Sequence, residues 1–172
     1  MLIEEGRIKA AFESGVFVLK LSGDVRLTLC ATLDSQAQQL AQTPGLKALM
    51  IDLREATNVD STALGFLAKV AMAVKGRLEQ SPTIIVDNPD VRQMLDVMGF
   101  ARFFTLMQEP LAENLPTAEE ELPEVPADEE GLRNRILEAH RILMHINDHN
   151  REQFQPLVEM LESQDPDSQP PK

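Results

Sequence analysis

The chain has 172 residues, enough for one domain with an appended segment, and its 43% hydrophobic content can supply one buried core. It carries 16 basic and 28 acidic residues, a formal charge of −12 that disfavours binding to nucleic acid or to an anionic membrane. The single cysteine, Cys30, excludes an internal disulfide, and the absence of a basic N-terminal segment or a long apolar run predicts a cytoplasmic protein.

The acidic residues are concentrated in the last third of the chain. Residues 1–112 hold 13 acids and 11 bases, whereas residues 113–172 hold 15 acids and 5 bases. The segment 113–131 contains eight acids, no base and three prolines, and cannot bury enough apolar surface to offset its ordering entropy. We therefore expect a domain over 1–112, an acidic linker over 113–131, a helical extension over 132–163 and a disordered tail over 164–172.

The first half of the domain begins with two short apolar segments, 7–12 and 16–21, joined through Ser14 and Gly15, which predicts a β-hairpin. Apolar residues over 27–42 repeat with helical spacing up to a Pro-Gly pair. The nearly continuous apolar segment 46–53 is typical of a strand covered on both faces.

The second half alternates helices and strands. Helical spacing over 60–78 is followed by an apolar strand over 83–86, and Asn88 with Pro89 then begins a helix that ends before Gly99. A short last strand is expected over 103–107. The order β-β-α-β-α-β-α-β predicts an α/β fold in which helices flank a mixed sheet.

The extension carries an apolar seam whose residues step by three and four positions, which predicts a helix from about 128 to 147. The seam consists of Leu132, Ile136, Ala139, Leu143 and Ile146. It either packs on the domain or is offered to a partner helix.

No catalytic, nucleotide-binding or zinc-protease motif occurs in the chain, so we expect a protein that is not an enzyme and has no cofactor. His145 and His149, with Asp148 between them, have the spacing of metal ligands on one helix. A solvated helix end is the simpler interpretation, and no metal site is predicted. Cys30 is expected to pack in the core.

One stretch, from Asn58 to Gly65 (NVDSTALG), stands out from the rest of the sequence. In the simplest interpretation, Asp60 or Ser61 caps the following helix. A hydroxyl at a helix N-terminus is also well placed for phosphorylation, because free N–H groups and the helix dipole stabilise the phosphate. The modification would add about −1.5 to −2 charges at an exposed junction and repel a partner docked there.

Together with its context, this stretch resembles the STAS domain of anti-sigma factor antagonists. The resemblance covers about residues 4–108 and includes LSGD at 21–24, LKALMIDL at 46–53 and the family's D-S-[ST]-[GA]-L-G motif at 60–65. It implies a STAS-like mixed sheet flanked by helices. It also implies partner switching, in which the unmodified protein binds an anti-sigma regulator and thereby releases a sigma factor.

Carried over by position, the resemblance makes Ser61 the phosphate acceptor and Thr62 the adjacent candidate, with Asp60 presenting the acceptor. The partner-binding surface it implies comprises Asp24, Arg26, Asn58, Asp60, Ser61, Thr62 and Leu64. Two residues depart from the family pattern: Arg26 stands where an acidic residue is frequent, and Ala63 replaces the commoner glycine.

The resemblance thus implies an anti-sigma factor antagonist controlled by a serine/threonine kinase and a metal-dependent serine/threonine phosphatase. The resemblance within residues 1–112, which includes LSGDVRLTLC, together with the long acidic helical extension implies a subgroup with response-regulator-type partners in bacterial general-stress signalling. The alternative is a STAS adaptor or small-ligand-binding module in which Ser61 only caps a helix.

Overall fold

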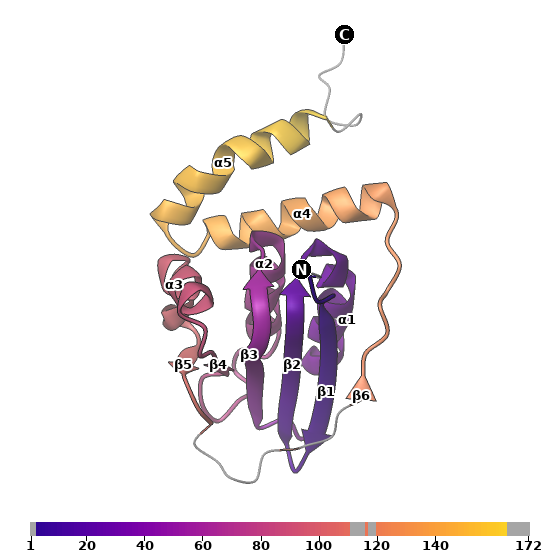
Figure 1. The fold of residues 1–172 in the computed structure, drawn as a ribbon, viewed down its shortest axis with the longest axis vertical. Helices are drawn as coiled ribbons and strands as arrows, with labels where there is room; N and C mark the ends of the chain where they lie inside the picture. The colour runs from indigo at the N-terminus through magenta and orange to yellow at the C-terminus, as the bar shows by residue number, and fades with distance from the viewer. Residues whose placement is uncertain (1–2, 111–115, 117–119, 165–172) are drawn as a thin grey trace.

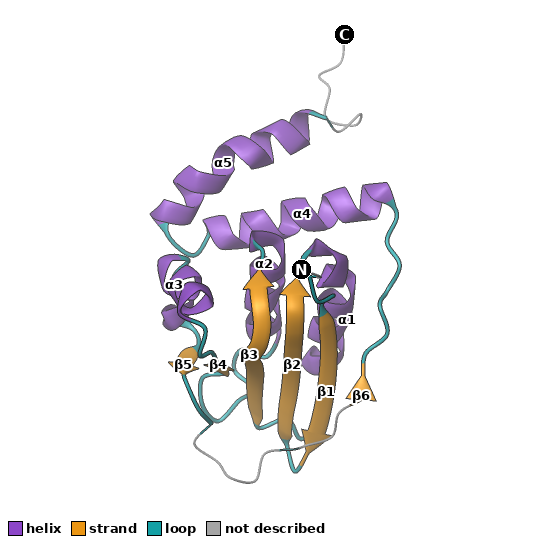
Figure 2. Ribbon diagram, viewed as in Figure 1, coloured by secondary structure: helices purple, strands orange, loops and turns teal. Residues whose placement is uncertain are grey.

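A computed structural model describes residues 3–110, 116 and 120–164 (Figures 1 and 2). Their six-stranded sheet has the order β5-β4-β3-β2-β1-β6. Its strands are β1 (Arg7–Glu13), β2 (Val16–Val25), β3 (Ala48–Val59), β4 (Thr83–Ile85), β5 (Thr105–Met107) and β6 (Glu120–Glu121). The helices are η1 (Leu27–Leu29), α1 (Cys30–Ala41), α2 (Ser61–Ala73), α3 (Pro89–Val97), η2 (Phe100–Arg102), α4 (Glu129–Met144) and α5 (Asp148–Ser163).

The sheet is mixed, as predicted. β1 and β2 form an antiparallel hairpin that turns at Ser14 and Gly15, both with positive φ. β2, β3, β4 and β5 then pair in parallel. Because parallel neighbours need crossover connections, α1, α2 and α3 lie between successive strands in the chain. The α/β fold predicted from the sequence is confirmed.

The core lies between one face of the sheet and helices α1 and α2. Along β2, Leu19, Leu21 and Val25 are buried while the residues between them are partly exposed, apart from Gly23, so one face of the strand points into the core. Leu33 of α1 and Leu67 of α2 are fully buried in the same cluster. This packing fixes the N-terminal end of α2 against the C-terminal ends of β2 and β3.

Two predicted boundaries differ from the structure by five residues or more. The strand expected over 46–53 extends to Val59 as β3, because the polar stretch after Leu53 still pairs with the end of β2. The helix expected over 60–78 ends at Ala73, and the chain then turns at Gly76, whose φ is +82°. The longer β3 delivers the chain directly to the start of α2.

The extension packs on the domain, which is the first of the two arrangements considered above. β6, in the acidic segment 113–131, pairs with β1, and α4 then crosses the N-terminal end of α2 (Figure 1). Ala139, Leu143, Ile146 and Phe154 belong to the main core cluster. No helix in the described part of the chain is both long and apolar enough to span a bilayer. Of the predicted tail, residues 165–172 lie outside the described residues.

Candidate functional site

The junction between β3 and α2 is organised by Asp60, the N-cap of α2. One carboxylate oxygen, Oδ1, accepts a hydrogen bond from the Ala63 N–H at 2.8 Å. The other, Oδ2, accepts from the Leu27 N–H at 2.9 Å, at the start of η1. Asp60 therefore caps the helix and ties it to the loop after β2. Of the two capping residues considered from the sequence, the structure selects Asp60, and the Ser61 hydroxyl is not needed for the cap.

The ends of β2 and β3 bring three predicted site residues together. Asp24 lies opposite Asn58 in the parallel register, next to a β-bulge. The Asn58 amide donates to Asp24 Oδ1 at 3.1 Å, and the exposed Arg26 guanidinium lies 3.5 Å from Asp24 Oδ2. These residues form a polar rim beside the start of α2.

The Ser61 side chain faces the extension. Its Oγ lies 2.8 Å from Nε2 of His140 on α4. The other ring nitrogen, Nδ1, lies 2.7 Å from the Ile136 carbonyl oxygen, which can only accept a hydrogen bond. Nδ1 of a neutral imidazole therefore carries the proton, and Nε2 accepts a hydrogen bond from the Ser61 hydroxyl. The predicted phosphate acceptor is thus engaged by a residue of the same chain.

The His140 ring is buried, with 2% of its surface exposed, and it packs edge-on against Phe154 of α5 at 4.9 Å between ring centroids. Burial lowers the pKa of His140, and the hydrogen bond to Ile136 and the nearby Asp60 carboxylate oppose this shift only in part. The neutral form is therefore favoured, in agreement with the geometry at Ser61.

Stability should decrease on acidification because of this histidine. A buried neutral imidazole binds fewer protons than the unfolded chain, so its contribution is complete above the unfolded pKa of about 6.5 and is lost as the pH falls towards the lower folded pKa. We expect the free energy of unfolding, measured by urea denaturation, to fall more steeply between pH 7.5 and 5.5 in the wild type than in His140→Gln. Parallel pH profiles would contradict this.

Two other predicted site residues are buried. Thr62 is 5% exposed and Leu64 is fully buried in the core. Neither offers its side chain to a partner in this structure, because successive positions of a helix point in different directions and these two point inward. Of the two hydroxyls, only that of Ser61, which is half-buried, points out of the domain core and towards α4.

One face of α2, formed by Ser61, Gly65 and Lys69 at intervals of four residues, carries α4. We call it the α2 docking face. A Cβ added to Gly65 would lie 2.5–2.6 Å from the backbone and Cβ of Ala139, so only glycine permits this approach. The Lys69 ammonium bonds to Glu138 of α4 and, at 2.6 Å, to Asp34 of α1. Burial would lower the pKa of Lys69, but these two carboxylates raise it overall.

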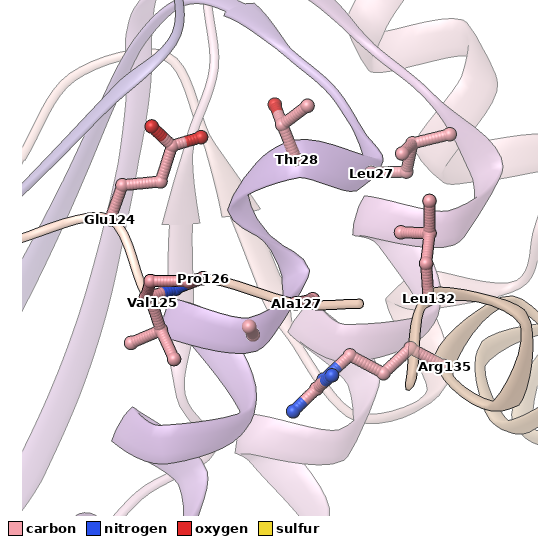
Figure 3. A pocket seen from close by; sticks show the side chains of 9 residues that line it. Leu27, Thr28, Glu124, Val125, Pro126, Ala127, Leu132 and Arg135 are labelled. Atoms are coloured by element: carbon pink, nitrogen blue, oxygen red, sulfur yellow. The ribbon is translucent and has the colours of Figure 1, made fainter. Parts of the chain in front are cut away.

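A cavity of about 290 Å³ lies between α1, the segment before α4 and α4 itself (Figure 3). Leu27 and Thr28 line one side, and Val125, Leu132 and Arg135 line another. A small ligand would find mainly apolar contacts and the Arg135 side chain there.

The histidine pair considered as metal ligands does not lie on one helix. His145 follows the end of α4 and bonds through Nδ1 to the Arg141 carbonyl oxygen at 2.6 Å, whereas His149 lies in the first turn of α5. Among the described residues, no group of three or more potential ligands could hold a metal ion. Cys30 is buried, as predicted, and burial raises the pKa of its thiol.

Sequence reasoning did not find His140 as a site residue. The apolar seam placed Ala139 on the buried face of the extension, and His140 is its neighbour. Ser61 and His140 are separated by 79 residues, however, and periodicity within one helix does not show which surface that helix covers.

Comparison with known proteins identifies a family and solved structures of similar fold. Residues 8–109 match the family described as Mlab, STAS domain. The fold resembles the crystal structure of an anti-sigma factor antagonist from Mycobacterium paratuberculosis, with a TM-score of 0.52 and 23% sequence identity over 61% of this chain and 87% of that one. No curated protein matches.

Proposed function

This chain belongs to the Mlab STAS domain family, and on that premise we propose that it is an anti-sigma factor antagonist that switches partners according to phosphorylation of Ser61. The partner is an anti-sigma factor or a response-regulator-type protein. A serine/threonine kinase modifies Ser61, and a metal-dependent phosphatase reverses the reaction. The protein acts in the cytoplasm by binding, not by catalysis.

The position of the Ser61 hydroxyl carries this proposal. Asp60 already caps α2, so the hydroxyl stands at the first position of the helix without a capping role. A phosphate there would be stabilised by the helix N-terminus and would leave the Asp60 cap in place. It would still bring about −1.5 to −2 charges to the docking face, enough to repel a partner.

The polar rim supports the same site. Asp24, Asn58 and the exposed Arg26 lie beside the start of α2 and can form part of the contact with a partner. Thr62 remains the second candidate acceptor, but its burial favours Ser61.

Substitution of Ser61 tests the switch. We expect Ser61→Ala to capture a partner from extracts of the native host, identified by mass spectrometry, and Ser61→Asp to capture less than a tenth of that amount. Asp imitates the charge of the modification, whereas Ala prevents it. The matched control is Ser81→Asp, which adds the same charge at an exposed position after α2.

Equal capture by the three variants would refute phosphorylation control. The protein would then be a constitutive STAS adaptor or a small-ligand-binding module, and the cavity between α1 and α4 would be the place to look for a ligand. Intact-mass measurement of the endogenous protein gives an independent check, because a phosphoryl group adds about 80 Da.

A further inference from the structure

The α2 docking face is occupied by the chain's own extension. Ser61, Gly65 and Lys69 contact His140, Ala139 and Glu138 in turn, so three consecutive residues of α4 meet three turns of α2. Each contact differs in kind: a hydrogen bond, a close backbone approach and an ion pair. The face thus recognises a helix with a small residue between a polar and an acidic one.

Two further anchors hold the C-terminal end of α4, where the chain turns to α5. Asn150, which is fully buried, donates to the carbonyl oxygens of Met98 and Leu143 at 2.9 Å each. The Arg102 guanidinium donates to the Ile146 carbonyl oxygen. The bond to Leu143 joins α5 to α4 in one hairpin, residues 129–163, and the other two bonds hold this hairpin on the domain.

A phosphoryl group on Ser61, in the side-chain orientation that the structure shows, does not fit beside the docked hairpin. The 2.8 Å contact between Oγ and Nε2 leaves no room for a phosphorus atom and its three oxygens. His140 cannot simply turn away, because its ring is buried against Phe154. A kinase that modifies this hydroxyl, or a partner that contacts it, can therefore bind only when the hairpin has dissociated from α2.

We infer that the hairpin is an internal competitor for the α2 docking face, so that hairpin and partner exclude each other. The partner docks with an amphipathic helix of the same kind as α4. This helix places a small residue against Gly65 and a neighbouring carboxylate next to Lys69. When α4 leaves, the Lys69 ammonium loses its ion pair with Glu138. The carboxylate of the partner helix can then pair with this ammonium. The identity of the partner rests on the proposed function, whereas occupation of the face by the hairpin does not.

Thiol labelling tests whether the hairpin protects Ser61. In Ser61→Cys, the new thiol is the only accessible cysteine, since Cys30 is buried. Fluorescein maleimide should label it at least tenfold faster when Ala139→Glu is added, because a carboxylate cannot be accommodated against Gly65. Glu138→Lys, which opposes Lys69 without entering the core, should give a smaller increase if Ala139→Glu fails to fold.

The exposed control Ser81→Cys should label at the same rate with and without each hairpin substitution. Labelling of Ser61→Cys that is equally fast in all backgrounds would overturn the inference, whatever becomes of phosphorylation.

A reversible cross-link tests competition with the partner. Met72 of α2 and His145 beyond α4 are exposed and line the same groove, about three helical turns from Ser61. Met72→Cys with His145→Cys, combined with Ser61→Ala and joined by a disulfide-containing bismaleimide, keeps the hairpin docked. We expect capture of the partner to fall at least tenfold and to recover when the linker is reduced.

Each single-cysteine variant, treated with the same reagent, is the control. If the locked chain captures the partner as well as the open one, the competition is refuted and the proposed function survives. If Ser61→Ala captures nothing even when Glu138→Lys weakens the docking of the hairpin, the proposed function fails and the partner part of the inference falls with it.

Discussion

Replacing Gly65 with leucine is expected to lower the free energy of unfolding by about 3 kcal/mol and to detach α4 from α2. A Cβ at this position would meet the backbone oxygen and Cα of Ala139, neither of which can turn away as a side chain can. Leucine has a better helix propensity than glycine by about 1 kcal/mol, but the steric cost exceeds this gain. Urea denaturation measures the loss, and faster amide hydrogen exchange in α4 shows where it occurs.

Two further variants make the interpretation specific. Gly65→Ala should destabilise less, because it adds one carbon atom and retains most of the gain in helix propensity. Adding Ala139→Gly to Gly65→Leu should restore only part of the lost free energy of unfolding. Two of the three Ala139 atoms closest to the added Cβ belong to the backbone and remain in the glycine variant. Wild-type stability of Gly65→Leu would show that α4 does not pack on α2 as described.

Replacing Asp60 with alanine is expected to lower the free energy of unfolding by about 3 kcal/mol. The substitution removes the cap of α2, at a cost of about 1 kcal/mol, and leaves the part-buried Leu27 N–H without its acceptor, at about 1–3 kcal/mol. Both losses occur at the junction that presents Ser61. Partner capture should therefore fall together with stability.

Asp60→Ser and Asp60→Asn separate the two losses. Serine restores the cap to Ala63 but does not reach Leu27, so about 1 kcal/mol should return. Asparagine keeps one acceptor oxygen for one of the two backbone N–H groups and turns its own amide N–H towards the other. The stability of Asp60→Asn should therefore also lie between those of the wild type and Asp60→Ala. Equal stability of alanine and serine would show that the cap contributes nothing.

The architecture of the domain could be predicted because its signals are local. Alternating burial along β2, the apolar start of β3 and the Asn88 cap of α3 each reflect the period or chemistry of one element. The polar end of β3 was missed because Arg54 to Asn58 lack an apolar pattern, and they pair through their backbone with β2. β6 was missed for the same reason, since two glutamates pair with β1 through backbone groups.

Of the candidate site, the sequence predicted the residues at the start of α2 but not those that α4 contributes. The motif around Asp60 and Ser61 combines a cap and a hydroxyl within adjacent residues, which a sequence displays directly. His140, Ala139 and Glu138 lie on a helix whose amphipathic seam predicts a buried face but does not name the surface that covers it. That information depends on the long-range approach permitted by Gly65, and a glycine in a helix has several possible explanations.

The pairing of β6 with β1 has a consequence for how strongly a partner must bind. Even when α4 leaves α2, the short stretch between Glu121 and Asp128 keeps it tethered close to its binding site. A helix on so short a tether has an effective concentration on the order of millimolar. A freely diffusing partner at micromolar concentration must therefore bind roughly a thousandfold more tightly than the tethered helix does, or first weaken its tether at the sheet edge.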